Sequence, residues 1–184
     1  MKESVRIAAN AIKGLNDITL KGEIVVFGST YMSKFPLYEL VNKSQFESAV
    51  YNRSIEGLTL CEALELLHDC VIAVKPKKVF IALGEEDEND PNAIEEYNKI
   101  IGEIGTVMPT CKIFLIGLLG ESEYTKKFNK NMLSLCDNKN IKYIQFISPT
   151  MSEQDLYKTR FKQMSCFFRD KPLNMLEAFA MADL

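Results

Sequence analysis

The sequence contains no tryptophan and only one histidine, His68, among its 184 residues. Imidazole is the side chain that most often moves protons near neutral pH, so a single histidine leaves few routes to acid–base catalysis. Five scattered cysteines form no CxxC pair, and a zinc site is therefore excluded. We expect no metal and no cofactor, and we expect the cysteines to be reduced, mostly buried thiols of a cytoplasmic protein.

Charge and hydropathy exclude further classes of protein. The formal net charge is −3 and no basic tract is present, so we expect no nucleic-acid partner. No apolar run approaches the ~18 residues that a membrane span requires, and the N-terminus has no apolar core of the signal-peptide kind. The length and the absence of linkers or repeats predict a single domain over residues 1–184.

Five short β-rich segments alternate with helical patterns along the chain. Most of these segments are continuous apolar runs, which is typical of parallel strands covered on both faces. The alternation predicts an α/β protein, a three-layer α/β/α sandwich around a five-stranded parallel sheet. The predicted strands are residues 23–28, 48–52, 77–83, 111–119 and 141–147.

The helices between these strands have recognisable ends. Thr59 and Glu62 have the spacing of a capping box. Asp90 followed by Pro91 predicts an N-cap and a first-turn proline for the helix after the third strand. In parallel sheets ligands bind at the carboxyl ends of the strands, so the loops that follow the strands are the candidate site. Further helices are predicted near residues 2–14, 124–135 and 174–182.

Four loops carry the residues on which a functional prediction depends. They read GST at residues 28–30, NRS at 52–54, GEED at 84–87 and DKPL at 170–173. Their order, spacing and flanking strands resemble those of the SGNH, or GDSL, hydrolases, a family of esterases and lipases with a flavodoxin-like fold. The resemblance covers nearly the whole chain and implies this fold.

The resemblance gives the first two loops a role in nucleophilic attack and in oxyanion binding. Thr30 follows Gly28 and Ser29 and stands where the family has its nucleophilic serine. Ser54 follows Asn52 and stands where a glycine amide of the family donates to the oxyanion. The simpler interpretation of the two hydroxyls in the first loop is that they bond backbone amides in a turn.

The third and fourth loops depart further from the family pattern. Glu86, beside Asp87, replaces the asparagine that faces the oxyanion. Asp170 matches the aspartate of the family, whereas Leu173 stands where the histidine base belongs. A carboxylate sets like charge against the intermediate, and loss of one donor already costs about 10²–10³ in rate. His68 is nine residues into its helix, roughly 13 Å from the strand ends, and we expect it to be partly buried.

Three functions follow from these departures. The first is a pseudoenzyme that binds a small-molecule ligand or a protein partner, with the acids favouring a cationic or polyhydroxylated ligand. The second is an esterase for small acyl or acyl-carbohydrate esters, with Thr30 as nucleophile and Asp87 or Asp170 as base. The third is a subunit that acts through surface contacts, such as a homodimer. Its anchors would be Phe35, Phe167 and Phe168.

The acidic run of residues 85–90 has its own alternatives. Such runs after a strand are usually solvated, and Arg53 is a candidate to pair with one of the acids. A Mg²⁺ or Ca²⁺ site formed with Asp170 is the less favoured interpretation, since no ligand spacing is recognisable.

Overall fold

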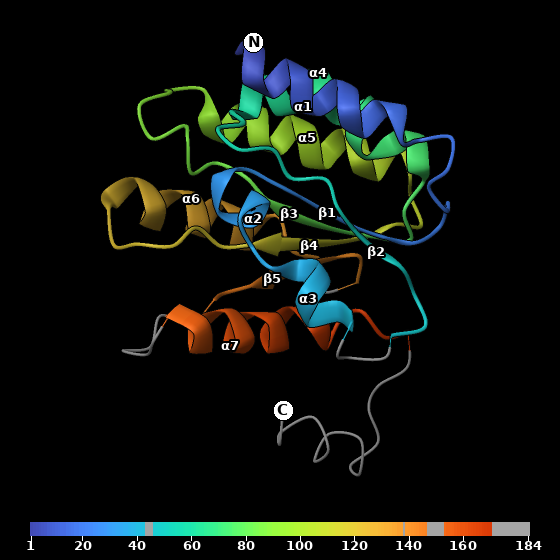
Figure 1. Ribbon diagram of the computed structural model, residues 1–184. Helices are drawn as coiled ribbons and strands as arrows, with labels where there is room; N and C mark the ends of the chain where they lie inside the picture. Colours follow the sequence, from blue (N-terminus) through green and yellow to red (C-terminus); the bar gives the residue numbers. More distant parts are fainter. Residues whose placement is uncertain (43–45, 138, 147–152, 171–184) are drawn as a thin grey trace.

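The computed structural model describes residues 1–42, 46–137, 139–146 and 153–170. These residues form a five-stranded parallel sheet with helices on both faces (Figure 1). The strand order is β2-β1-β3-β4-β5, so the predicted sandwich and all five predicted strands are confirmed, although each strand is shorter than its apolar segment. The strands are β1 (Ile24–Gly28), β2 (Val50–Asn52), β3 (Lys78–Ala82), β4 (Lys112–Ile116) and β5 (Ile141–Ile144).

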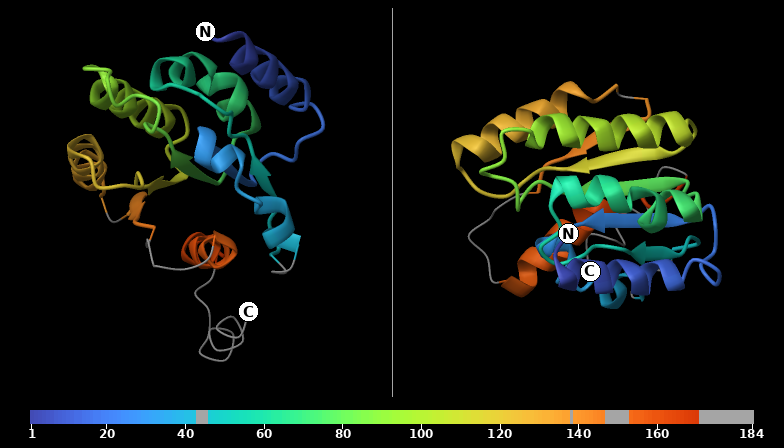
Figure 2. Two further views of the ribbon diagram at one scale, coloured as in Figure 1. Left: turned by 60° about the vertical axis from the view of Figure 1, so that its left-hand side comes forward. Right: turned by 90° about the horizontal axis from the view of Figure 1, so that it is seen from above.

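Two layers of helices enclose the sheet, as the two views of Figure 2 show. A short 3-10 helix, Ile72–Val74, leads into β3. One face is covered by α1 (Glu3–Gly14), α4 (Leu60–Cys70), α5 (Ala93–Val107) and α6 (Glu123–Ser134). The other face is covered by α2 (Thr30–Ser33), α3 (Leu37–Asn42) and α7 (Glu153–Ser165).

The continuous apolar runs are explained by the two cores that the sheet separates. Successive side chains of a strand point to opposite faces. Val25 therefore packs under α1 and α4, whereas Val26 packs under α7. On the α7 face the rings of Phe80 and Phe114 stack with centroids 4.6 Å apart across β3 and β4. Because both faces of the central strands are covered, β1 shows no polar alternation in the sequence, and all five of its residues are buried.

The helix ends agree with the sequence at α4 and differ at α5. The Thr59 hydroxyl accepts from the Glu62 N–H at 3.4 Å, and the Glu62 carboxylate accepts from the Thr59 N–H at 3.2 Å, which confirms the capping box. Helix α5 begins at Ala93, and Asp90 instead accepts from the Asn92 N–H at 2.8 Å in the preceding turn. The helix predicted near 174–182 lies outside the described residues.

Helix α7 was not predicted from the sequence, and its direction matters for the site. Its first half contacts the loop after β1, where the Tyr157 and Tyr31 rings stack with centroids 6.4 Å apart. Its thirteen residues, at ~1.5 Å each, span about 20 Å, the length of the sheet. The chain therefore passes from the carboxyl edge of the sheet to the amino edge before it reaches residue 166.

Two expectations about side-chain exposure are corrected by the fold. Cys70 and Cys111 are buried, whereas Cys61 and Cys166 are exposed, so the thiols are not mostly buried. The proposed dimer anchors belong to the core: Phe35 is 3% exposed, Phe168 is 1% exposed and Phe167 is half-buried. No helix in the described part of the chain is both long enough and apolar enough to cross a membrane.

Candidate functional site

The loops after β1, β2 and β3 meet at the carboxyl edge of the sheet, around Thr30. Its hydroxyl donates to the Glu86 carboxylate in a very short hydrogen bond. The same hydroxyl oxygen accepts from the Gly57 N–H at 2.9 Å. Thr30 and Glu86 are 56 residues apart in sequence, and their contact arises because β1 and β3 are adjacent in the sheet.

Backbone N–H groups around Thr30 are already bonded to acceptors of the protein. The Tyr31 N–H donates to the Glu85 carboxylate at 2.7 Å, and the Gly57 N–H donates to Thr30 itself. An oxyanion hole needs fixed donors that point at the place where the charge develops. In this arrangement both donors are occupied, and carboxylates stand where a negative charge would form.

Ser54, the expected oxyanion donor, is bonded within its own loop. Its N–H donates to Asn52 Oδ1 at 3.1 Å, while Asn52 Nδ2 donates to the Met32 carbonyl at 2.9 Å. The Ser54 hydroxyl is buried and has no hydrogen-bond partner in the described part of the chain. The donor that does face Thr30, Gly57, was missed in the sequence. The available signal was its position as the lone glycine of this loop, and the structure gives it a φ of +73°.

The residues before Thr30 form a tight strand end. Ser29 is fully buried, with its hydroxyl 3.5 Å from Glu86 Oε1, so it cannot meet a substrate as a displaced nucleophile. At Gly28 a Cβ atom would lie 2.8 Å from the Ala82 carbonyl oxygen of β3. Only glycine fits between the two strands, and this contact fixes where the following loop leaves the sheet.

The loop after β3 is anchored at Gly84. This residue has φ +107°, and a Cβ atom there would lie 2.6 Å from the Phe128 ring of α6. Its carbonyl accepts a hydrogen bond from the Tyr124 hydroxyl at 2.6 Å. The acidic residues that follow are thus held on a fixed turn rather than on a loose loop.

Asp87 is turned into the protein, away from Thr30. Its side chain is 4% exposed, and Oδ1 accepts from the Leu60 N–H at the start of α4 at 3.0 Å. Oδ2 has no partner within the described residues. Burial raises the pKa of Asp87 to about 6, although the bond from Leu60 acts in the opposite direction. Asp87 therefore positions α4 and is not the base of Thr30.

The remaining acids give the site a negative field. Glu85 and Glu86 are both exposed at the edge. Partial desolvation raises the pKa of Glu85, and the hydrogen bond from the Tyr31 N–H opposes this rise. The nearby ammonium of Lys34 forms its ion pair with Glu56 at 2.6 Å, which raises the pKa of Lys34. The two exposed carboxylates thus remain available to a ligand.

Arg53, expected to neutralise the acids, points elsewhere. Its guanidinium is buried and donates to Asn16 Oδ1 at 2.5 Å and to the Thr19 hydroxyl at 2.8 Å. A third, longer bond runs to the Cys70 carbonyl at 3.3 Å. Arg53 therefore ties the segment between α1 and β1 to the loop after β2, and the acids keep their charge.

A cavity lies beside Glu85 on the α7 side of the edge. It has a volume of about 60 Å³ and is lined by residues that include Tyr31, Glu85, Leu118 and Phe146. It adjoins an open hollow of about 680 Å³ between α6 and the end of β5, because Leu118 and Phe146 line both. The Tyr31 hydroxyl accepts a hydrogen bond from the Arg160 guanidinium of α7 at 2.8 Å.

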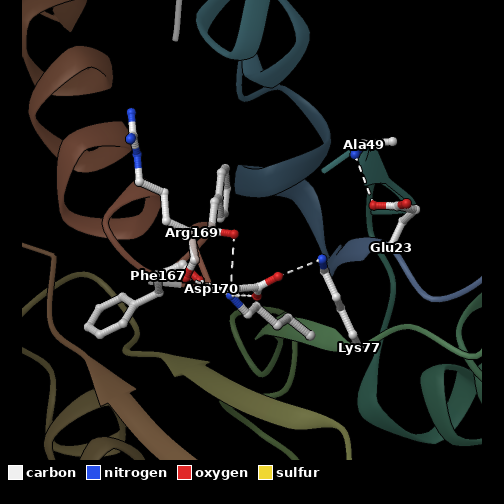
Figure 3. A network of polar contacts seen from close by, with 8 residues as sticks. Glu23, Ala49, Lys77, Phe167, Arg169 and Asp170 are labelled. Carbon is white, nitrogen blue, oxygen red and sulfur yellow. Dashed lines mark hydrogen bonds and ion pairs between the residues drawn. The ribbon is translucent and has the colours of Figure 1, made fainter. Parts of the chain in front are cut away.

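The structure does not bring Asp170 to this site. Its carboxylate accepts from Lys77 at 2.9 Å and pairs with Lys78 at 2.8 Å, at the amino end of β3 (Figure 3). Helix α7 is the reason, because it carries the chain to the opposite edge before residue 170 is reached. Leu173 lies outside the described residues. His68 is at the last turn of α4 with its side chain 73% exposed, so it is not the partly buried residue that we expected.

No group of three or more His, Cys, Asp or Glu side chains in the described part of the chain is arranged to hold a metal ion. The metal interpretation of the acidic run needed Asp170, which lies at the other edge of the sheet.

Comparison with known proteins gives the class of the fold. No protein-family model matches the sequence, and no curated protein matches it either. Solved structures do match: a Streptococcus pneumonia protein provisionally named a platelet activating factor has a TM-score of 0.79 at 16% identity, over 91% of this chain and 94% of that one. The chain thus shares its fold with that protein.

Two further structures make the class specific. A GDSL-like lipase from Bacteroides thetaiotaomicron matches with a TM-score of 0.67 at 12% identity, over 95% of this chain and 97% of that one. A lipase/acylhydrolase from Enterococcus faecalis matches with a TM-score of 0.62 at 20% identity, over 83% of this chain and 98% of that one. The five-stranded parallel sheet in the order 2-1-3-4-5 with its flanking helices is therefore the SGNH hydrolase fold, as predicted.

Proposed function

We propose that this chain is an SGNH-fold protein that does not hydrolyse esters and that binds a small ligand at the carboxyl edge of its sheet. The single observation that supports the proposal is the position of the Thr30 hydroxyl. It is held between the Glu86 carboxylate and the Gly57 N–H, and the donor that could have stabilised an oxyanion is taken by the hydroxyl.

The absence of a suitable base supports the same conclusion. A hydroxyl nucleophile needs a group that accepts its proton near neutral pH, and carboxylates are ordinarily much weaker bases than imidazole. His68, the one imidazole of the sequence, is exposed at the far end of α4. Asp87 is bonded to Leu60, and Asp170 is bonded to two lysines at the other edge.

The chemistry of the edge indicates what kind of ligand it binds. Glu85 and Glu86 are exposed acceptors, and Leu118 and Phe146 line the same cavity as Glu85. A ligand with an amine or several hydroxyl groups at one end meets the carboxylates, and its less polar part lies along Leu118 and Phe146. We therefore propose a cationic or polyhydroxylated small molecule as the ligand.

Ester hydrolysis tests the first half of the proposal. The purified chain is incubated with nitrophenyl acetate and nitrophenyl butyrate, alongside the variants Thr30→Ala, Glu86→Gln and, as a matched control, Glu88→Gln. We expect the same background turnover from all four proteins. Turnover by the wild type that is lost in Thr30→Ala and kept in Glu88→Gln would show that the chain is an esterase.

Thermal unfolding tests the second half. At 100 times its dissociation constant a ligand adds about 2.7 kcal/mol to the stability of the folded state, which raises Tm by about 5–10 °C in a chain of this size. We expect such a rise with an amine or sugar in the wild type and in Glu88→Gln, and a smaller rise in Glu85→Gln. A series of amines and neutral sugars without any effect on Tm would refute the small-ligand proposal.

One observation favours a second candidate function, an esterase that acts on small acyl or acyl-carbohydrate esters. The hydrogen bond between Thr30 and Glu86 has the connectivity of a nucleophile and its base. In this alternative Glu86 takes the proton of Thr30, and the Gly57 N–H becomes free for the oxyanion once the hydroxyl has attacked. Loss of turnover in both Thr30→Ala and Glu86→Gln is the result that distinguishes it.

A further inference from the structure

A second charged region lies at the opposite edge of the sheet, where the strands begin. A cavity of about 320 Å³ opens there between the end of α7 and the first residues of β3, β4 and β5. We call it the amino-edge basic pocket. Six of the residues that line it carry the argument: Lys78, Lys112, Phe114, Lys139, Lys142 and Phe167.

The sheet register gathers three of these lysines on one face. Lys78 and Lys112 are directly paired across β3 and β4, and Lys142 is paired with Phe114 across β4 and β5. Because residues two apart on a strand share a face, Lys112 is on the side of Phe114, which is the α7 face. On this otherwise apolar face, neighbouring strands about 4.8 Å apart place like charges side by side.

Lys78 is neutralised by the end of α7. Its side chain is buried, and its ammonium donates to the carbonyls of Phe167 at 3.0 Å and Arg169 at 2.8 Å, besides its ion pair with Asp170 (Figure 3). The Arg169 side chain itself turns away along α7 and lies over the Phe46 ring at 5.7 Å. Lys78 is thus internally satisfied, and Arg169, although it also lines the cavity, directs its guanidinium toward Phe46.

The other three lysines keep their charge. Lys112 donates only to neutral acceptors, the Lys139 carbonyl at 3.2 Å and Asn140 Oδ1 at 2.6 Å. Lys142 lies over the Phe167 ring at 5.7 Å. Within the described residues no carboxylate forms an ion pair with Lys112, Lys139 or Lys142. Three ammonium groups without a carboxylate partner therefore line one cavity of a chain whose net charge is −3. Asp170 lines the same cavity, but its carboxylate is bonded to Lys77 and Lys78.

The nearest acid of the same turn does not neutralise them either. Asp137 uses its carboxylate to accept from the N–H groups of Lys139, Asn140 and Ile141 at 2.7 to 2.9 Å. These bonds lower the pKa of Asp137 and shape the turn that presents Lys139. The backbone of this turn is thus held in place by Asp137, while the ammonium groups at the rim of the pocket can bind a ligand.

We propose that the amino-edge basic pocket binds a small ligand that carries a multivalent phosphate group. Ammonium groups act as point charges toward phosphate, so their affinity follows the charge of the ligand rather than a fixed fork geometry. The volume falls at the lower end of the ~300–1,000 Å³ that small-molecule sites occupy. Phe114 and Phe167 supply an apolar wall for the part of the ligand that bears the phosphates. The site is separate from the carboxyl edge and does not depend on the function proposed for it.

Calorimetric titration of the full chain with pyrophosphate, orthophosphate and sulfate tests the proposal. We expect pyrophosphate to bind most tightly and its affinity to fall as salt is added, because exposed charges are screened. Lys139→Gln with Lys142→Gln removes two exposed ammonium groups without touching the core. A hydrogen bond to a charged group is worth about tenfold in affinity or more, so this double variant should bind pyrophosphate about 100-fold more weakly.

The matched control is Lys127→Gln with Lys130→Gln on α6, which removes the same charge from exposed positions outside the pocket. Its affinity for pyrophosphate should equal that of the wild type. No binding of pyrophosphate by the wild type, or equal binding by the two double variants, would overturn the proposal. Tighter binding of single-stranded RNA than of pyrophosphate, lost in Lys139→Gln/Lys142→Gln, would assign the pocket to a nucleic acid and would also overturn it.

Discussion

Replacing Asp87 by asparagine should remove a pH-dependent loss of stability. The carboxyl group is 4% exposed, and one of its oxygens has no partner in the described part of the chain. Burial raises its pKa to about 6. Asparagine has nearly the same shape, can keep the bond from the Leu60 N–H and cannot ionise, so the variant isolates the titration of this group.

The sign of the effect follows from proton binding in the two states. The folded chain holds the proton of Asp87 up to about pH 6, whereas an unfolded aspartate releases it near pH 3.9. Between these values the folded state binds more protons, so the free energy of unfolding falls as the pH rises. A shift of about two units at 1.36 kcal/mol per unit gives about 3 kcal/mol as the upper bound of this loss.

Urea unfolding followed by circular dichroism between about pH 4 and pH 8 measures the effect. Relative to Asp87→Asn, the wild type should lose up to about 3 kcal/mol as the pH rises through 6, and then no more. Asp69→Asn is the control of opposite sign, because the ion pair with Lys13 lowers the pKa of Asp69 and stabilises the fold above the unfolded pKa. If the difference between wild type and Asp87→Asn is the same at both ends of the pH range, the argument from burial is wrong.

Four substitutions test the packing of the fold. Gly84→Ala should lower the free energy of unfolding by about 2–4 kcal/mol in a thermal unfolding assay, because a Cβ meets the Phe128 ring at a positive φ. Gly102 lies in open space on α5, and Gly102→Ala should raise the free energy of unfolding by about 0.5–1 kcal/mol in the same assay. Thr59→Ala removes the cap of α4 and should cost about 1 kcal/mol in urea unfolding, and an unchanged midpoint would contradict the capping box. Arg53→Met should cost about 2–3 kcal/mol by leaving the buried Cys70 carbonyl and two partly buried acceptors unpaired, and hydrogen exchange should locate the loosening between α1 and β1.

The architecture could be predicted from the sequence because burial on both faces leaves a strong pattern. Runs such as the one around Val25 and Val26 have no polar alternation, and a sheet covered on both sides explains why most of the five segments look like this. The strand order then follows from the resemblance to known loops, and with it the meeting of Thr30 and Glu86 across β1 and β3. The apolar runs and the strand order are properties of whole segments, and a change of single residues does not remove them from the sequence pattern.

The details of the site depend on features that a sequence pattern does not carry. Helix α7 has a polar composition and few buried side chains, such as Phe161 and Met164, so no stripe marked it. Without that helix, Asp170 was placed at the wrong edge of the sheet. Asp87 is buried and Glu86 is exposed, although both belong to one acidic run. Their burial depends on which part of the fold covers each side chain, and the sequence of the run does not show this.

Helix α7 touches both ends of the sheet. In its second half Arg160 holds the Tyr31 hydroxyl of the first loop, and just beyond its end the carbonyls of Phe167 and Arg169 hold the Lys78 ammonium. A rigid helix that is bonded at both of these points cannot slide at one of them without straining the other. Any change that moves α7 along its axis will therefore disturb both the Tyr31 contact and the Lys78 contact, although these two contacts lie apart. Substitutions meant to probe one edge of the sheet alone belong on other elements.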